Sequence, residues 1–169
     1  MSCFMTTGAA VPATWVKVAK LTITAAASGT IAATGTHKFF KLVGRIHAVS
    51  GAAGAYITFN GDAAAHYSWG GSSGSLWAYN TGQNGIFFGS TDNSNDSPIE
   101  LNFPGNLPEG GNTPGMTINS GLWTSNDFKN AFWGRWVTSP ATISSLTIGI
   151  NAGTMSGEFE LYYNAELES

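Results

Sequence analysis

Hydrophobic and polar residues alternate with a period of two along most of this chain, which is the spacing of side chains on one face of a β-strand. The alternation is clearest in residues 38–49, where Lys41, Arg45 and His47 fall on one face among apolar residues. The opposite face carries small or apolar residues, namely Phe40, Leu42, Gly44, Ile46 and Ala48. We therefore predict a long strand with a core face and a second face that meets solvent or a partner.

Shorter alternating segments predict further strands. They are residues 15–24, 56–59, 84–90, 98–103, 143–150 and 158–165, with one more strand inside 123–138. Breaks in the alternation predict bulges near Ala19 and Ser144. Residues 30–34 are expected to pair back on 15–24 as a hairpin. Residues 38–62 are expected to form a strand pair that ends at an Asn60-Gly61 turn, and residues 158–165 are expected to close the sheet.

Two stretches between these strands read as long loops. Residues 63–83 are rich in Gly and Ser yet carry aromatic side chains, which predicts a loop with aromatic anchors; residues 104–121 are rich in Pro, Gly and Asn. No window has a helical period. The sequence thus predicts an all-β protein, an antiparallel jelly-roll β-sandwich of about eight to ten strands with long aromatic loops.

The domain is expected to span residues 15–169, preceded by an extended N-terminal arm at residues 1–14. Phe4, Met5 and Val11 are the apolar points of this arm. The arm is either a loose terminus or a segment that docks on a neighbouring subunit. Residues 1–15 lack the basic start and the apolar run of a signal peptide, so synthesis in a cytoplasm is expected.

Composition narrows the class of partner. Only 10% of the residues are charged, against roughly 25% in an ordinary soluble domain. Such a surface suits a protein that lies against other subunits, and equally a secreted or virion-surface protein. The net charge of −3 and seven scattered basic residues argue against nucleic acid. No apolar run or basic amphipathic segment points to a membrane, and Cys3 is alone, so no internal disulfide can form.

Catalytic and metal-binding motifs do not stand out. His37, His47 and His66 lack zinc-ligand spacing, and no nucleophile motif occurs. Oxygen side chains alternate in residues 92–96, from Asp92 to Asp96, as in a calcium loop, but the central Gly and distant Glu of such a loop are missing; a polar turn is the alternative. We expect no enzymatic activity and no cofactor.

Aromatic side chains are the strongest functional signal. Tryptophan and tyrosine beside Asn and Ser either stack on sugars or anchor subunit interfaces. The low charge of the chain favours an interface. With the apolar points of the arm, the expected interface residues are Phe4, Met5, Val11, Trp69, Trp77, Tyr79, Trp123 and Trp133.

Four segments together resemble a known group of proteins. They are W-V-K-V-A-K-L-T-I from Trp15, F-F-K-L-V-G-R-I from Phe39, Y-I-T-F-N-G-D from Tyr56 and G-E-F-E-L-Y-Y from Gly157. This pattern resembles small jelly-roll structural proteins of tailed bacteriophages, which occur as capsid decoration (cement) proteins and as head or tail fibre domains. The resemblance implies a place in the virion, frequent homotrimers and no catalysis.

The leading hypothesis from the sequence is a capsid decoration protein on the outer capsid surface. It would bind as a homotrimer to the major capsid protein and stabilise adjacent subunits. The alternative is a tail- or fibre-associated receptor-binding module that recognises a cell-surface glycan.

Overall fold

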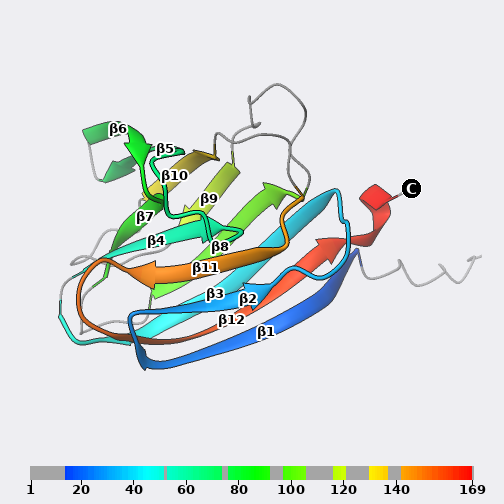
Figure 1. Cartoon of the computed structure of the whole chain (residues 1–169), viewed down its shortest axis with the longest axis horizontal. Helices are drawn as coiled ribbons and strands as arrows, with labels where there is room; N and C mark the ends of the chain where they lie inside the picture. The colour runs from blue at the N-terminus through cyan, green and yellow to red at the C-terminus, as the bar shows by residue number, and fades with distance from the viewer. Residues whose placement is uncertain are drawn as a thin grey trace, which may run out of the picture.

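The alternating segments form two antiparallel sheets in the computed structural model of the chain (Figure 1). The structure describes residues 14–51, 53–73, 76–91, 97–105, 116–120, 130–136 and 142–168. Within them, the larger sheet has eight strands in the order β1 (Trp15–Ala26), β12 (Met155–Asn164), β3 (Phe39–Val49), β8 (Ser97–Pro104), β9 (Met116–Ser120), β10 (Asn130–Trp136), β5 (Tyr67–Ser73) and β6 (Leu76–Gln83). The smaller has four, β2 (Ser28–Ala32), β11 (Ser145–Ile150), β4 (Ala53–Phe59) and β7 (Ile86–Thr91). The prediction of an all-β, antiparallel protein is confirmed.

Strand pairing is nested along the chain. β1 pairs with β12, β2 with β11, β3 with β8 and β4 with β7. β12 also pairs with β3, and β11 with β4, which joins the outer and inner pairs. Each step from β1 to β4 takes the chain from one sheet to the other. Most contacts are therefore between residues far apart in sequence.

This pairing corrects three local expectations. Residues 30–34 do not form a hairpin with 15–24, because β2 pairs with β11 in the other sheet. The two strands of residues 38–62 are likewise separated, with β3 in the larger sheet and β4 in the smaller. Residues 158–165 do not close a sheet, since β12 lies between β1 and β3. Alternation identifies a strand but carries no information about its neighbour.

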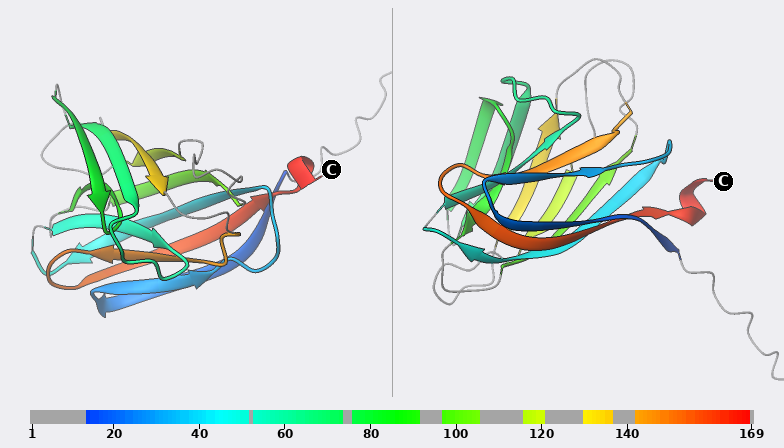
Figure 2. Two further views of the ribbon diagram at one scale, coloured as in Figure 1. Left: turned by 45° about the horizontal axis from the view of Figure 1, so that its top comes forward. Right: turned by 60° about the horizontal axis from the view of Figure 1, so that its bottom comes forward.

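The prediction of an aromatic loop at residues 63–83 is wrong. Most of this segment forms β5 and β6, which pair with each other and, through β5, with β10. The expected loop at 104–121 also contains a strand, β9. We call β9, β10, β5 and β6 the extension of the larger sheet; β5 and β6 rise from the rest of the molecule at one end (Figure 2). Gly and Ser are poor strand formers, and pairing on both sides of β5 overrides that preference.

The core lies between the two sheets, which face each other as two layers (Figure 2). Phe40 and Leu42 of β3 are fully buried, as are Phe159 and Leu161 of β12. From the smaller sheet, every second residue of β4 reaches the same core, namely Ala55, Ile57 and Phe59. The predicted core face of residues 38–49 is thus confirmed for Phe40, Leu42 and Ile46.

Bulges change which residues face the core. The expected bulge near Ala19 is present, because the register of β1 against β12 shifts between Lys17 and Ala19. A second bulge was not predicted. Ile46 pairs with Gly157 and Ala48 with Ser156, so His47 is the extra residue. An extra residue reverses the alternation beyond it, and Val49, expected on the open face, is buried at 7% exposure.

Candidate functional site

The Phe-Asn-Gly-Asp segment at the end of β4 is a structural corner. Asn60 and Gly61 have φ of 52° and 70°, and the Asp62 amide donates to the Phe59 carbonyl at 2.9 Å. Two consecutive positive φ angles are those of a type I′ turn, which Asn-Gly adopts with little strain. The Asn60 Oδ1 atom also accepts from the amide of Ser144, 2.7 Å away, just before β11. The segment therefore fixes the end of β4 to the start of β11.

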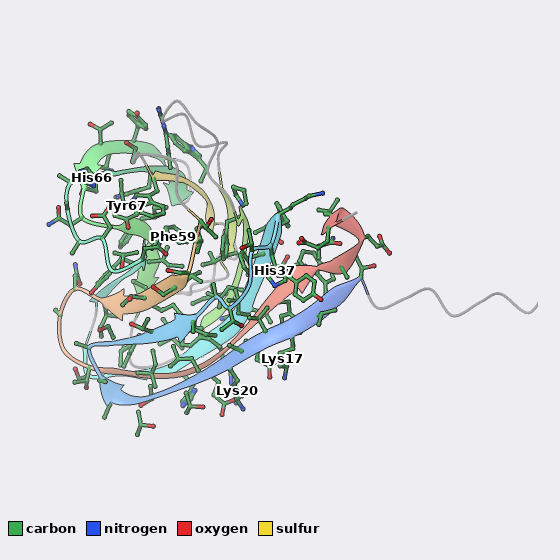
Figure 3. The ribbon with its side chains drawn as sticks, turned by 45° about the vertical axis from the view of Figure 1, so that its right-hand side comes forward. Lys17, Lys20, His37, Phe59, His66 and Tyr67 are labelled. Carbon is green, nitrogen blue, oxygen red and sulfur yellow. The ribbon has the colours of Figure 1, made fainter. Side chains whose placement is uncertain are left out.

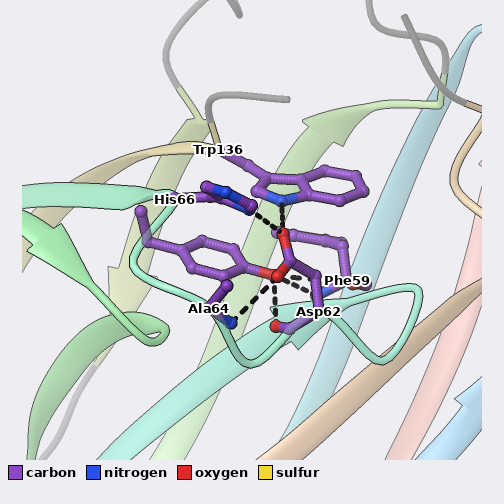
Figure 4. A network of polar contacts seen from close by, with 6 residues as sticks. Phe59, Asp62, Ala64, His66 and Trp136 are labelled. Carbon is purple, nitrogen blue, oxygen red and sulfur yellow. Dashed lines mark hydrogen bonds and ion pairs between the residues drawn. The ribbon is translucent and has the colours of Figure 1, made fainter. Parts of the chain in front are cut away.

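The carboxylate of Asp62 gathers three donors (Figure 4). Oδ2 accepts from Nε1 of Trp136 at 2.7 Å and lies 2.9 Å from Nδ1 of His66, while Oδ1 accepts from the amide of Ala64 at 2.9 Å. Partial desolvation acts to raise the pKa of Asp62, but these hydrogen bonds outweigh it and hold the pKa below its ordinary value of 3.8. The ionised carboxylate thus ties the corner to β10.

Tyr67, the first residue of β5, completes the corner. Its side chain is fully buried; its hydroxyl accepts from the Phe59 amide at 2.9 Å and donates to the Asp62 carbonyl at 3.0 Å. Burial raises the pKa of Tyr67, so the hydroxyl stays protonated and can donate. The side chains of Asn60, Asp62 and Tyr67 thus hold this corner to β11, β10 and β5.

The three histidines lie in separate surroundings; His37 and His66 are labelled in Figure 3. His37 stacks on Tyr163 with ring centroids 3.8 Å apart, His47 is exposed at the bulge of β3, and His66 contacts Asp62. Across the described ranges, no three His, Cys, Asp or Glu side chains come together as a metal site. The calcium-like segment at Asp92–Asp96 lies outside the described residues. No helix in the described chain is long and apolar enough to span a bilayer.

The outer face of the larger sheet is charged over β1, β12, β3 and β8. Lys17 contacts Glu160 at 2.6 Å, and Lys41 contacts Glu100 at 3.1 Å. The hydrogen bond from Lys17 is the main cause that lowers the pKa of Glu160. Lys17 and Lys20 project from β1 away from the core (Figure 3). Opposite charges alternate across these strands, so this face is suited to contact with water.

The outer face of the smaller sheet has the opposite character, because none of its four strands contains a charged residue. A groove of about 630 Å³ lies on this face beside the extension. Tyr56 and Phe87 are paired across β4 and β7, and Trp69 of β5 approaches Phe87 with ring centroids 5.0 Å apart. Hydroxyl and amide groups complete the lining, from Thr58, Gln83, Asn84, Thr147 and Asn151.

A pair of exposed aromatic rings marks the opposite face of the extension. Tyr79 of β6 and Trp133 of β10 stack with centroids 5.5 Å apart and planes 25° from parallel. They are 64% and 37% exposed. Between them lies Gly70 of β5, which pairs with both residues; a Cβ atom there would come within 2.7 Å of the Trp133 ring. The glycine thus lets the tryptophan lie across β5 and reach the tyrosine.

The structure divides the expected interface residues into four groups. Tyr79 and Trp133 form the exposed pair, whereas Trp69 lies on the other face of the extension and lines the groove. Trp77 belongs to β6, but its side chain is not among those described. The remaining predicted residues lie outside the described part of the chain: Phe4, Met5, Val11 and Trp123. The one described residue of the arm, Thr14, accepts from the Ala165 amide at 2.8 Å.

Sequence reasoning missed the groove residues of the smaller sheet. The sequence predicts only that Tyr56 and Phe87 lie in strands. The missing signal was parity: Gly54, Tyr56 and Thr58 alternate with the core residues Ala55, Ile57 and Phe59. An aromatic ring on the outward parity of a strand is a candidate for binding. Phe87 lies beside Tyr56 because β7 pairs with β4, and the sequence alone does not predict that pairing.

Comparison with protein-family models, with curated proteins and with solved structures found no match for this chain.

Proposed function

We propose that this protein is a structural protein of a bacteriophage virion, a capsid decoration (cement) protein. It binds the outer surface of the head as a homotrimer and stabilises adjacent subunits of the major capsid protein. The resemblance of its strand segments to small jelly-roll proteins of phage virions is the starting point of this proposal. Features of the fold and of the surface support it.

The order of the strands supports a jelly-roll sandwich. Without the extension, eight strands remain, and their pairs join the first strand to the last, the second to the last but one, and so on inward. A long hairpin rolled up in this way, with its strands shared between two sheets, is the arrangement of the jelly rolls that occur in viral capsid domains. The strands of the extension are then insertions between β4 and β7 and between β8 and β11.

The observation that carries the proposal is the exposed stack of Tyr79 on Trp133. Tyrosine and tryptophan dominate the binding energy of protein interfaces. Here both rings are held on paired strands, so little conformational entropy is lost when a partner covers them. The strands β5 and β6 carry no charged residue, and Arg135 of β10 lies two residues from Trp133. A capsid subunit that covers this face therefore meets a mainly neutral surface with one cation at its side.

Binding to heads that lack the protein tests the proposal. Purified protein is added to such heads of the phage that encodes it, and both bound protein and thermal stability of the heads are measured. We expect saturable binding and a higher disruption temperature. Tyr79→Ser should weaken binding about tenfold or more, while Lys20→Ser, on the charged face, should bind as the wild type does. Absence of binding, or of any gain in head stability, would overturn the decoration role.

A further inference from the structure

We propose that the groove on the outer face of the smaller sheet binds a neutral oligosaccharide. This site is separate from the Tyr79–Trp133 pair and does not depend on the decoration role. Its volume of about 630 Å³ falls within the roughly 300–1,000 Å³ of small-ligand sites. Gly54, Tyr56 and Thr58 line it along β4, a span of roughly 13 Å at about 3.3 Å per residue. An elongated ligand fits such a groove better than a single sugar.

The rings of the groove are arranged for stacking. A Cβ atom on Gly149 would lie 2.6 Å from the hydroxyl oxygen of Tyr56, and one on Gly85 would lie 3.2 Å from its Cδ2. The Tyr56 ring therefore lies over Gly149 of β11, the residue with which Tyr56 pairs, and it is half-buried. Gly54 makes room for Phe87 in the same way, because a Cβ atom on Gly54 would lie 2.5 Å from Cε2 of the Phe87 ring. Half-buried rings on a fixed sheet offer apolar faces to the C–H faces of a sugar ring.

The polar groups suit hydroxyl groups that both donate and accept. The Asn151 side chain is oriented by the Gly54 amide, which donates to its Oδ1 at 2.8 Å; among the described residues no acceptor is bonded to its Nδ2. Gln83 uses Nε2 to donate to the Thr81 carbonyl at 3.0 Å, which leaves its Oε1 to accept. Thr147 shares a hydrogen bond of 2.9 Å with Thr30. Donors and acceptors are thus spread along the groove.

The charge of the lining selects the class of ligand. No lysine, arginine, aspartate or glutamate is among the described residues that line the groove. A nucleic acid or an acidic polysaccharide would bring anionic groups without a cation to meet them. A peptide that adds a strand needs a free sheet edge. The strands β4 and β11 are each paired on two sides, and β7, the edge strand of the smaller sheet beside the groove, packs against β5 and β10 of the extension. The neutral sugar is the ligand that remains.

Calorimetric titration of the full chain with cellotetraose, maltotetraose and chitotetraose tests the site, with tetragalacturonate as the acidic comparison. We expect at least one neutral probe to bind saturably at millimolar concentration and tetragalacturonate to bind at least tenfold more weakly. Tyr56→Ala should weaken binding about tenfold or more, while Tyr56→Phe should stay within about threefold of the wild type because the ring is kept.

Two further variants keep the test valid even if Tyr56→Ala fails to fold. Ala63 is exposed and lines the groove, so Ala63→Trp should fill the groove and abolish binding without disturbing the core. Tyr79→Ala, on the other face of the extension, should leave binding unchanged. The proposal is overturned if none of the neutral probes binds, if tetragalacturonate binds as well as they do, or if Ala63→Trp binds like the wild type.

Discussion

At Asp62 a single residue connects three parts of the molecule. It follows β4 of the smaller sheet, and its side chain and backbone bond to Trp136 of β10 and Tyr67 of β5 in the extension. Trp136 is only 3% exposed, so its indole N–H would be left without water if the carboxylate were lost. A buried donor that loses its acceptor costs about 1–3 kcal/mol. The corner is therefore a point where one side chain sets the position of the extension.

Asp62 should make stability depend on pH in the acid range. Its folded-state pKa lies below 3.8, its ordinary value, so its ionised form stabilises the native state. That contribution is present above the unfolded-state pKa and is lost as the pH falls through the folded-state pKa. We expect Asp62→Asn to lower the free energy of unfolding by about 1–2 kcal/mol at neutral pH, with the difference from the wild type shrinking below the ordinary pKa. Urea unfolding across a pH series measures this.

A second variant checks the cause of this effect. Trp136→Phe removes the indole donor but keeps an aromatic ring in the core. It should reduce the acid dependence of stability in the same direction as Asp62→Asn. Equal stability of Asp62→Asn and the wild type at every pH would contradict a stabilising role for the carboxylate.

At the scale of single elements, the contact between β3 and β12 depends on a residue without a side chain. Gly44 pairs with Phe159, and a Cβ atom at Gly44 would lie 2.4 Å from the Phe159 ring and 2.5 Å from the Glu158 carbonyl oxygen. The second contact is with backbone, which cannot turn aside as a flexible side chain does. β3 and β12 thus approach closely because position 44 is glycine, and the Phe159 ring occupies the space.

Gly44→Ala should therefore destabilise the protein, by about 1–3 kcal/mol, which is the usual cost of overpacking a core. Gly51 offers a matched control, because a Cβ atom there would meet no atom of the described residues within 4 Å, its chain neighbours apart. Gly51→Ala should change the free energy of unfolding by less than about 0.5 kcal/mol. The comparison is made from urea unfolding curves of both variants. A Gly44→Ala protein as stable as Gly51→Ala would show that β12 can shift without loss.

At the scale of the whole molecule, charge is divided between the two layers. Lysines, an arginine and glutamates cover the outer face of β1, β12, β3 and β8, while the smaller sheet has no charged residue in its strands. One broad face is thus suited to water, and the other, with the extension, is suited to partners. A chain with 10% charged residues concentrates many of them on one side.

The proposed homotrimer is a prediction at this scale. Sedimentation equilibrium of the purified protein should give three times the 17.6 kDa of one chain. Self-association would bury neutral, apolar surface that is costly to leave in water. High salt screens contacts between charges but not contacts of this kind, so the trimer should persist at high salt. A mass of one chain at micromolar concentration would contradict the homotrimer and would leave the sugar site untouched.

Much of the local structure followed from alternation alone. The strand at residues 38–49, its core residues and the bulge near Ala19 all follow from which side chains leave water. The strands β5 and β6 did not, because their Gly and Ser content is typical of loops and only pairing with β10 makes them strands. Of the residues proposed to bind partners, Trp69, Tyr79 and Trp133 were predicted, but their division between two faces was not.

Alternation along the chain predicts antiparallel strands and the core residues Phe40, Leu42 and Ile46, and composition marks aromatic rings rather than charges as the candidates for contact with partners. These properties depend on side chains within one segment and on their affinity for water. Which strands are neighbours, and hence that Tyr56 and Phe87 share a groove with Trp69 and that Tyr79 stacks on Trp133, depends on tertiary packing. Those contacts join residues distant in sequence, and the register that brings them together is set by packing between two sheets, which no single segment encodes.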